Sequence, residues 1–169
     1  MTGTENIITA GCKCGGVELE VTGALILCAA CHCADCYAGS RQIEALPNAC
    51  PILDRFGGTP YVLYRKDRIR YSKGAQLVKG FKVEVDSPSR IVATCCNSAM
   101  LMDLPNPMHW VPVYRARFQG EVPALEMRIN AKFKATDIDV PSDVPSYSSF
   151  PLKFVAKLLA AKVAMVFHR

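Results

Sequence analysis

The sequence predicts a mainly β protein whose antiparallel sheets surround cysteine metal sites, with one α-helix at the C-terminal end. Two observations support this fold class. Between residues 59 and 118, short runs rich in β-branched and aromatic residues alternate with turn residues, and connections this short favour antiparallel pairing. The chain also holds nine cysteines, most of them in clusters, a number that packing alone does not explain.

The N-terminal part of the chain predicts two paired strands. Residues 17–21 alternate apolar and polar side chains with period two, which is typical of a half-buried strand. Gly23 then turns the chain into a second apolar run at 24–28. We expect the two runs to form a hairpin that leads into the cysteines that follow.

The middle of the chain predicts one short helix and then a series of strands. The helix is expected at 37–46, where Pro47 ends it. The strands are separated by Gly57-Gly58, Ser87-Pro88 and Pro105-Asn106-Pro107. They are expected at 61–64, 69–71, 77–85, 90–95, 99–102 and 111–118.

The C-terminal part predicts a loop and then a long helix. Residues 135–149 are rich in Pro, Ser and Asp, which favours a loop, and residues 151–167 repeat apolar side chains at helical spacing. We therefore divide the chain into a domain at 1–150 and an amphipathic helix at 151–169. The helix is expected to pack on the domain or on a partner, and the alternative is an anionic membrane surface, because lysines are interspersed. The repeated apolar residues are Leu152, Val155, Leu158, Leu159, Val163, Val166 and Phe167.

Composition limits the classes of function. A length of 169 residues, half of them apolar, is typical of one compact domain. No apolar run approaches the ~20 residues that span a bilayer, and the polar segment 1–9 lacks the pattern of a signal peptide. We therefore expect a cytoplasmic protein without an integral membrane segment. The net charge of +5 is modest, and no dense basic patch with aromatics predicts a nucleic-acid partner.

The cysteines form three clusters with metal-ligand spacing. They are Cys12-Lys13-Cys14, the run from Cys31 through Cys33 to Cys36, and the pair Cys95-Cys96. Zinc prefers about four tetrahedral ligands, and C-x-C or C-x-x-C spacing lets two sulfurs of one loop face one ion. In a reducing compartment such cysteines are ligands or catalysts more often than disulfides. Three alternatives remain: an iron–sulfur cluster that uses Cys28, disulfide bonds, and buried structural thiols.

These motifs resemble a known family. The pattern Cys-x-Cys-Gly-Gly-Val from Cys12, then Cys-His-Cys-x-x-Cys from Cys31, then the pair Cys95-Cys96 before Asn97-Ser98 is similar to the glutathione-dependent formaldehyde-activating enzymes. That family includes the centromere protein V-like proteins and has the Mss4-like β fold. The motifs span residues 12–102, and the C-terminal part carries none of them.

The resemblance implies two Zn²⁺ sites. A structural site would use Cys12, Cys14, Cys95 and Cys96. A catalytic site would use Cys31, Cys33 and Cys36, with a fourth position open for a substrate thiol. We expect one or two Zn²⁺ ions per chain.

Two positions differ from the family's pattern. Its late Cys-x-x-Cys-Gly is Thr94-Cys95-Cys96-Asn97 here, and neighbouring residues of a strand point to opposite faces. Both sulfurs can therefore reach one ion only if the backbone turns at this pair. Tyr37 stands where the family commonly has an arginine that would suit an anionic thiol.

The function expected from this resemblance is that of a zinc-dependent carbon–sulfur lyase or thiol–aldehyde adduct enzyme. A thiol such as glutathione, or a thioether or hemithioacetal, would be the substrate, and a homodimer is left open. One alternative is a zinc-stabilised binding module without chemistry. Another is a redox sensor in which Cys95 and Cys96 form a switchable disulfide.

Residues near the clusters have expected roles as well. We expect His32 to point away from the metal, and His109 to pack at a strand edge. Asp35 and Tyr37 are solvated loop residues or, alternatively, proton carriers. Cys28 and Cys50 are expected to be small buried hydrophobes, with Cys28 the reserve ligand if the catalytic site is closed by four sulfurs.

Overall fold

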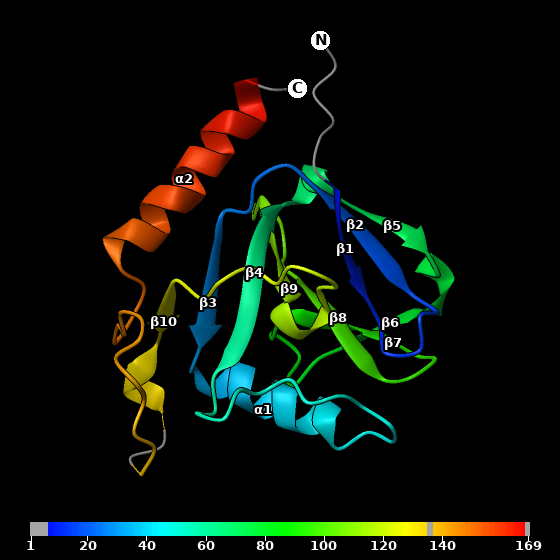
Figure 1. Cartoon of the computed structure of the whole chain (residues 1–169), viewed down its shortest axis with the longest axis horizontal. Coiled ribbons are helices and arrows are strands. Elements are labelled where there is room, and N and C mark those ends of the chain that lie inside the picture. Colours follow the sequence, from blue (N-terminus) through cyan, green and yellow to red (C-terminus); the bar gives the residue numbers. More distant parts are fainter. Residues whose placement is uncertain (1–6, 135–136, 168–169) are drawn as a thin grey trace.

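The computed structural model describes residues 7–134 and 137–167 and contains two sheets and two α-helices (Figure 1). The smaller sheet has the order β1-β2-β5 and the larger one β10-β3-β4-β9-β8-β7-β6. The elements in chain order are β1 Ile7–Gly11, β2 Glu18–Thr22, β3 Leu27–Cys31, α1 Ala34–Glu44, β4 Thr59–Arg65, β5 Ile69–Lys73, β6 Val78–Phe81, β7 Ser89–Ala93, β8 Ser98–Asp103, β9 Trp110–Tyr114, β10 Met127–Ile129 and α2 Leu152–Phe167.

The predicted fold class is confirmed. Every strand pair is antiparallel except β10 with β3, which run parallel at the edge of the larger sheet. The expected strands are all present, although several bounds differ. The strand expected at 77–85 ends at Phe81, and the one expected at 111–118 ends at Tyr114, where a 3₁₀ turn at Arg115–Arg117 follows.

The predicted hairpin of 17–21 with 24–28 is wrong. β2 pairs with β1 and β5, whereas β3 pairs with β4 and β10 in the other sheet. Burial explains the separation: all five residues of β3 are buried, as in a strand covered on both faces, while β2 alternates between buried and half-buried residues. The turn at Gly23 therefore carries the chain from one sheet to the other.

Strands β1 and β10 were not expected from the sequence. β1 pairs along its whole length with β2, from Ile7 opposite Thr22 to Gly11 opposite Glu18. β10 is only three residues long, which is too short for a period-two pattern to stand out. Residues 1–6 of the polar N-terminal segment, and 135–136 of the expected loop, lie outside the described residues.

The core forms on both faces of the larger sheet. Alternate residues of β4 divide between the two faces: Tyr61 and Leu63 join the cluster beneath the helices, and Val62 and Tyr64 join the cluster shared with the smaller sheet. Cys31 and Cys36 belong to the first cluster, and Cys12 and Cys96 to the second. The two groups of cysteines therefore lie on opposite sides of the larger sheet.

The C-terminal helix α2 lies along the outside of the molecule beside β3 (Figure 1) and packs on the first core cluster through Phe154 and Leu158. Two contacts hold it: His109 Nε2 donates to the carbonyl of Leu158 at 2.7 Å, and Lys157 pairs with Glu126 at 2.5 Å. Within the described part of the chain, no helix is long and apolar enough to cross a membrane. The division of the chain at residue 150 stays a prediction.

Candidate metal centres

The first group of cysteines gathers four sulfurs from two turns. Cys12 and Cys14 lie just after β1, and Cys95 and Cys96 lie between β7 and β8. All four Sγ atoms are within 4.8 Å of one another. The Sγ of Cys12 is 3.7 Å from the Sγ of Cys14 and 3.7 Å from that of Cys95. Four sulfurs placed tetrahedrally at ~2.3 Å from one ion would be separated by about 3.8 Å, so this group could hold a metal ion.

A turn of the backbone brings the adjacent Cys95 and Cys96 to the same side. Residues 94–97 form a turn rather than a strand, and Asn97 takes a left-handed conformation with φ of 53°. The alternation of a strand therefore does not apply there, and the condition for both sulfurs to approach one ion is met. Gly16 fits closely beside the group, because a Cβ at this position would lie 3.0 Å from the Sγ of Cys95.

Hydrogen-bond donors also point at this group. The backbone N–H of Val17 donates to Cys12 Sγ at 3.2 Å. Ser98 Oγ accepts from the N–H of Lys13 at 3.1 Å and lies 3.1 Å from Cys96 Sγ, so its own proton is free to go to that sulfur. Burial raises the pKa of Cys96, but the hydrogen bonds, first that of Ser98, outweigh burial and lower it to about 6. The surroundings favour a thiolate.

The second group places three sulfurs at the start of α1. Cys31 ends β3, Cys33 is the N-cap of α1, and Cys36 lies in its first turn. Their Sγ atoms are all within 4.8 Å of one another. The helix was expected to begin at Tyr37 and in fact begins at Ala34, because Cys33 Sγ accepts the N–H of Cys36 at 3.3 Å and so caps the helix. The positive end of the helix dipole favours thiolates there.

The three sulfurs cannot all carry a charge without a cation. Hydrogen bonds from the thiols of Cys33 and Cys36 lower the pKa of Cys31 to about 3. The same contacts with Cys31 raise the pKa of Cys33 and raise that of Cys36 well above its usual value, with burial adding to both. One thiolate is thus stabilised at the expense of the other two. This donor set fits a metal ion, which would balance the charge of all three.

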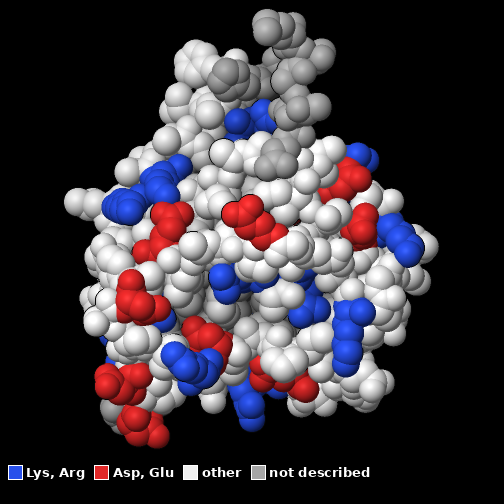
Figure 2. Space-filling model, viewed as in Figure 1, with Lys and Arg blue, Asp and Glu red and all other residues white. Residues whose placement is uncertain are grey.

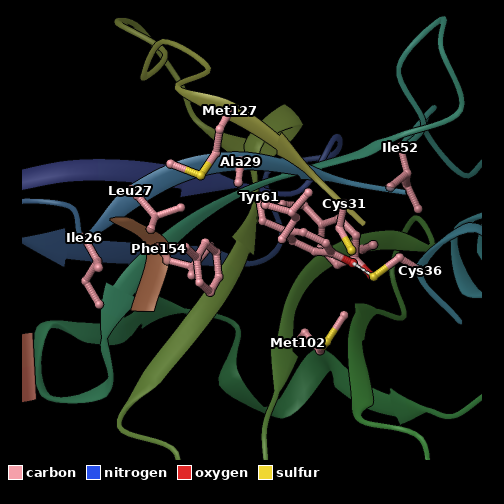
Figure 3. Close-up of a cluster of buried hydrophobic side chains, with 14 of the residues drawn as sticks. Ile26, Leu27, Ala29, Cys31, Cys36, Ile52, Tyr61, Met102, Met127 and Phe154 are labelled. Atoms are coloured by element: carbon pink, nitrogen blue, oxygen red, sulfur yellow. Dashed lines mark hydrogen bonds between the residues drawn. The ribbon is translucent and has the colours of Figure 1, made fainter. Parts of the chain in front are cut away.

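Two further residues contact the sulfurs. Asn130, which follows β10 in a left-handed conformation, donates from Nδ2 to Cys31 Sγ at 3.4 Å. The Tyr61 hydroxyl lies 3.9 Å from Cys36 Sγ and points at it from β4 (Figure 3). Sequence reasoning missed both, since Tyr61 had been assigned only a strand position. An asparagine is enriched where φ is positive, but nothing local connects residue 130 with residue 31.

A cavity of about 430 Å³ opens beside this group. Cys31 and Cys36 both line it, with the Tyr61 ring beside them and Met102 below them in the view (Figure 3). Helix α2 and Phe150, two residues before it, also contribute to the lining. The full lining is Ala29, Cys31, Cys36, Tyr61, Leu63, Met102, Leu104, Met108, Trp110, Pro112, Ile129, Phe150, Phe154, Val155 and Leu158. The volume is within the usual range of small-molecule sites.

The remaining residues considered from the sequence lie outside the two groups. His32 is only 3% exposed, and neither of its ring nitrogens has a partner among the described residues; burial lowers its pKa, so the ring is neutral. Asp35 accepts from Arg90 at 2.6 Å and from the Ser87 hydroxyl at 2.7 Å, which assigns it a structural contact. Tyr37 is half exposed.

His109 and the two other cysteines have structural surroundings. The His109 ring meets Trp110 edge to face, in addition to its bond to α2. Cys28 is fully buried on the other face of the larger sheet, where burial raises its pKa to about 11. It therefore does not close the three-cysteine group. Cys50 is half-buried, with its Sγ 3.9 Å from Ser98 Oγ. All nine cysteines lie in the described part of the chain, and all are free thiols.

Comparisons with known proteins add little to this geometry. No protein-family model and no curated protein matches the chain. Among solved structures, the chain is similar to the crystal structure of a protein from Rhodobacter sphaeroides, at 17% sequence identity and a TM-score of 0.48, over 82% of this chain and 98% of that one. A likeness of this degree transfers neither family nor activity.

Proposed function

We propose that Cys31, Cys33 and Cys36 bind Zn²⁺ and that the protein forms or cleaves thiol–aldehyde adducts, as a carbon–sulfur lyase of the glutathione-dependent formaldehyde-activating type. One observation supports this most: a group of three sulfurs, without a fourth cysteine, opens on a cavity of small-molecule size. Catalytic zinc sites typically have three protein ligands and an open position, whereas structural sites have four ligands. By the same reasoning, the four-cysteine group is a structural zinc site.

The donors suit zinc. Thiolates are soft ligands that select zinc over the harder divalent ions, and the free thiols of both groups suit a reducing compartment such as the cytoplasm. When bound, Zn²⁺ would supply the positive charge that keeps the three thiolates ionised and stabilises the thiolate of a substrate.

The chain's own residues orient these sulfurs. Tyr61 keeps its proton, because burial raises its pKa well above the usual value, and it therefore stays a donor toward Cys36. Asn130, which follows β10 on the other side of β3 from β4, donates to Cys31. Both are positioning residues that fix the two sulfurs facing the cavity, so a substrate sulfur reaches the group from the cavity side.

The reaction needs no redox partner. In the forward direction the substrate thiol gives up its proton and the sulfur attacks the carbon of an aldehyde. A carbon–sulfur bond forms, the π bond of the carbonyl breaks, and the oxygen takes up a proton, so the product is a hemithioacetal. In the reverse direction the hydroxyl proton leaves, the carbon–sulfur bond breaks, and its electron pair returns to sulfur.

Metal content and thiol binding test the proposal. Untagged protein should hold close to two zinc ions, and Cys33→Ser should lower this to about one while Cys50→Ser leaves it unchanged. In the cobalt-substituted protein, small thiols should shift the absorption bands of the three-cysteine site, and Cys33→Ser should abolish that shift. Exchange between formaldehyde and a thiol, followed by NMR, should be faster with the zinc protein than with Cys33→Ser.

The rival function is a zinc-stabilised binding module without chemistry. The closed four-cysteine group supports a purely structural role for at least one ion. If metal is present at both groups and no thiol shifts the cobalt bands, the module is the better interpretation and the lyase proposal is rejected.

A further inference from the structure

The walls of the cavity are almost entirely apolar. Besides Cys31 and Cys36, the lining contributes two polar side-chain groups, the indole N–H of Trp110 and the hydroxyl of Tyr61, and that hydroxyl is directed to Cys36 Sγ. None of the described lining residues is a lysine, an arginine or a histidine. A ligand that enters the cavity thus meets sulfur at one end and hydrocarbon or aromatic surface elsewhere.

We propose that the substrate thiol of this site carries a small uncharged apolar group, alkyl or aryl, which occupies the cavity while its sulfur meets the three-cysteine group. This inference rests on the proposed function and names the class of its substrate. The cavity of about 430 Å³ has room for an alkyl chain or an aryl ring beside the sulfurs. Glutathione has two carboxylates and a charged amine that these walls cannot partner, so the thiol–aldehyde chemistry proposed above would use a different thiol.

Electrostatics disfavours an anionic thiol. Three thiolates on one Zn²⁺ carry a net charge of −1, which repels a carboxylate brought close to them. The buried Arg90 donates from Nη2 to both the side chain and the carbonyl of Asp35 and does not line the cavity. Lys157 of α2 pairs with Glu126 and does not line the cavity. A carboxylate in the cavity would therefore lose water without gaining a partner.

Helix α2 contributes to this preference for an uncharged apolar group. Phe154, Val155 and Leu158 all face the cavity, and the His109 bond to the Leu158 carbonyl fixes the helix at that point. Val155 is 42% exposed, so it lies at the mouth, between solvent and the cavity. A charged side chain at position 155 should therefore change which thiols enter the cavity. The sulfurs and the buried walls would stay in place.

The experiment compares two thiols of similar length that differ in charge, 1-butanethiol and 3-mercaptopropionate, with 1-butanol as the analogue that lacks sulfur. Trp110 is the one tryptophan of the chain and lines the cavity, so its fluorescence reports binding in the zinc protein without any assay of activity. We expect butanethiol to bind at least tenfold more tightly than mercaptopropionate and than butanol. Each methylene added from ethanethiol to butanethiol should tighten binding about three- to fourfold.

Two matched variants test the geometry. Val155→Lys places a cation at the mouth, and Val163→Lys makes the same change on the exposed part of α2, away from the cavity. Lysine is a better helix former than valine, so both variants should fold. The preference is the ratio of the dissociation constants of mercaptopropionate and butanethiol. Val155→Lys should lower this ratio by fivefold or more, and Val163→Lys should leave it unchanged.

Failure of this inference differs from failure of the proposed function. If mercaptopropionate or glutathione shifts Trp110 fluorescence and the cobalt bands as strongly as butanethiol does, thiol chemistry stands and the apolar substrate class is overturned. Equal effects of Val155→Lys and Val163→Lys would overturn it too. If no thiol shifts the cobalt bands, the proposed function fails, and the substrate class fails with it.

Discussion

Replacing the adjacent cysteines one at a time tests whether both bind the same ion. Cys95→Ser and Cys96→Ser each remove one of four sulfurs that lie within 4.8 Å of one another. A structural zinc site with four ligands binds its ion with about 10–16 kcal/mol at neutral pH. If the ligands contribute equally, each substitution costs about 2.5–4 kcal/mol, a loss of metal affinity of roughly 70- to 900-fold.

The assay is competition with a chelator of known affinity, with thermal unfolding as the second measurement. A ligand that binds only the native state stabilises it by RT ln(1 + [L]/Kd), where [L] is the free ligand concentration. Weaker zinc binding therefore lowers the melting temperature as well. Cys50→Ser is the matched control, because Cys50 is close to the group through Ser98 but is not one of the four. The metal affinity of Cys50→Ser should stay within threefold of that of the unchanged protein.

One result would refute the reasoning. If either Cys95→Ser or Cys96→Ser behaved like Cys50→Ser, the site would use three cysteines, and the turn at residues 94–97 would not serve to present both sulfurs. If instead mild oxidant formed a disulfide between the pair in the metal-loaded protein without loss of fold, the redox interpretation would replace the structural one.

Other substitutions test single contacts. Asn130→Ala removes the donor to Cys31 and should weaken metal binding at the three-cysteine group by about tenfold, measured by chelator competition. Leu158→Ala, at a buried position, should lower the free energy of unfolding by about 2–3 kcal/mol in urea titrations, whereas Leu159→Ala, which is 58% exposed, should change it by less than ~0.5 kcal/mol. Gly16→Ala should loosen the four-cysteine group, because the new methyl group would press on a sulfur, and should raise the rate of zinc release to a chelator. Removing all metal with a chelator should lower the melting temperature in a zinc-reversible way.

Local patterns predicted most of the elements but not their partners. The strand signals at residues 61–64 and 99–102 were confirmed because period and residue type act within a few positions. Whether β3 pairs with β2 or with β4 depends instead on which strand is buried on both faces, and this is decided by contacts far along the chain. The hairpin prediction failed for that reason. β10 was not predicted, because three residues are too few to show the period-two pattern of a strand.

The cysteine groups show the same division between local and distant information. Spacing alone identified the clusters at Cys12-Lys13-Cys14 and around Cys33, since two sulfurs of one loop must lie close together. That Cys95 and Cys96 both approach Cys12 depends on the turn that ends at Asn97, which a strand pattern does not reveal. The cavity could not be predicted at all, because its walls come from five strands, two loops and both helices.

The two cysteine groups lie on different faces of the larger sheet, so their proposed roles in stability and in chemistry can be tested separately. The four-cysteine group joins β1 to the β7–β8 turn and so connects the two sheets. The three-cysteine group sits on the other face of the larger sheet, beside a cavity that α2 completes. If each group has the role proposed, a ligand lost from the first should lower the melting temperature more than it lowers thiol binding. A ligand lost from the second should do the reverse. Because the groups share no side chain, combining Cys12→Ser with Cys33→Ser should give additive losses of stability.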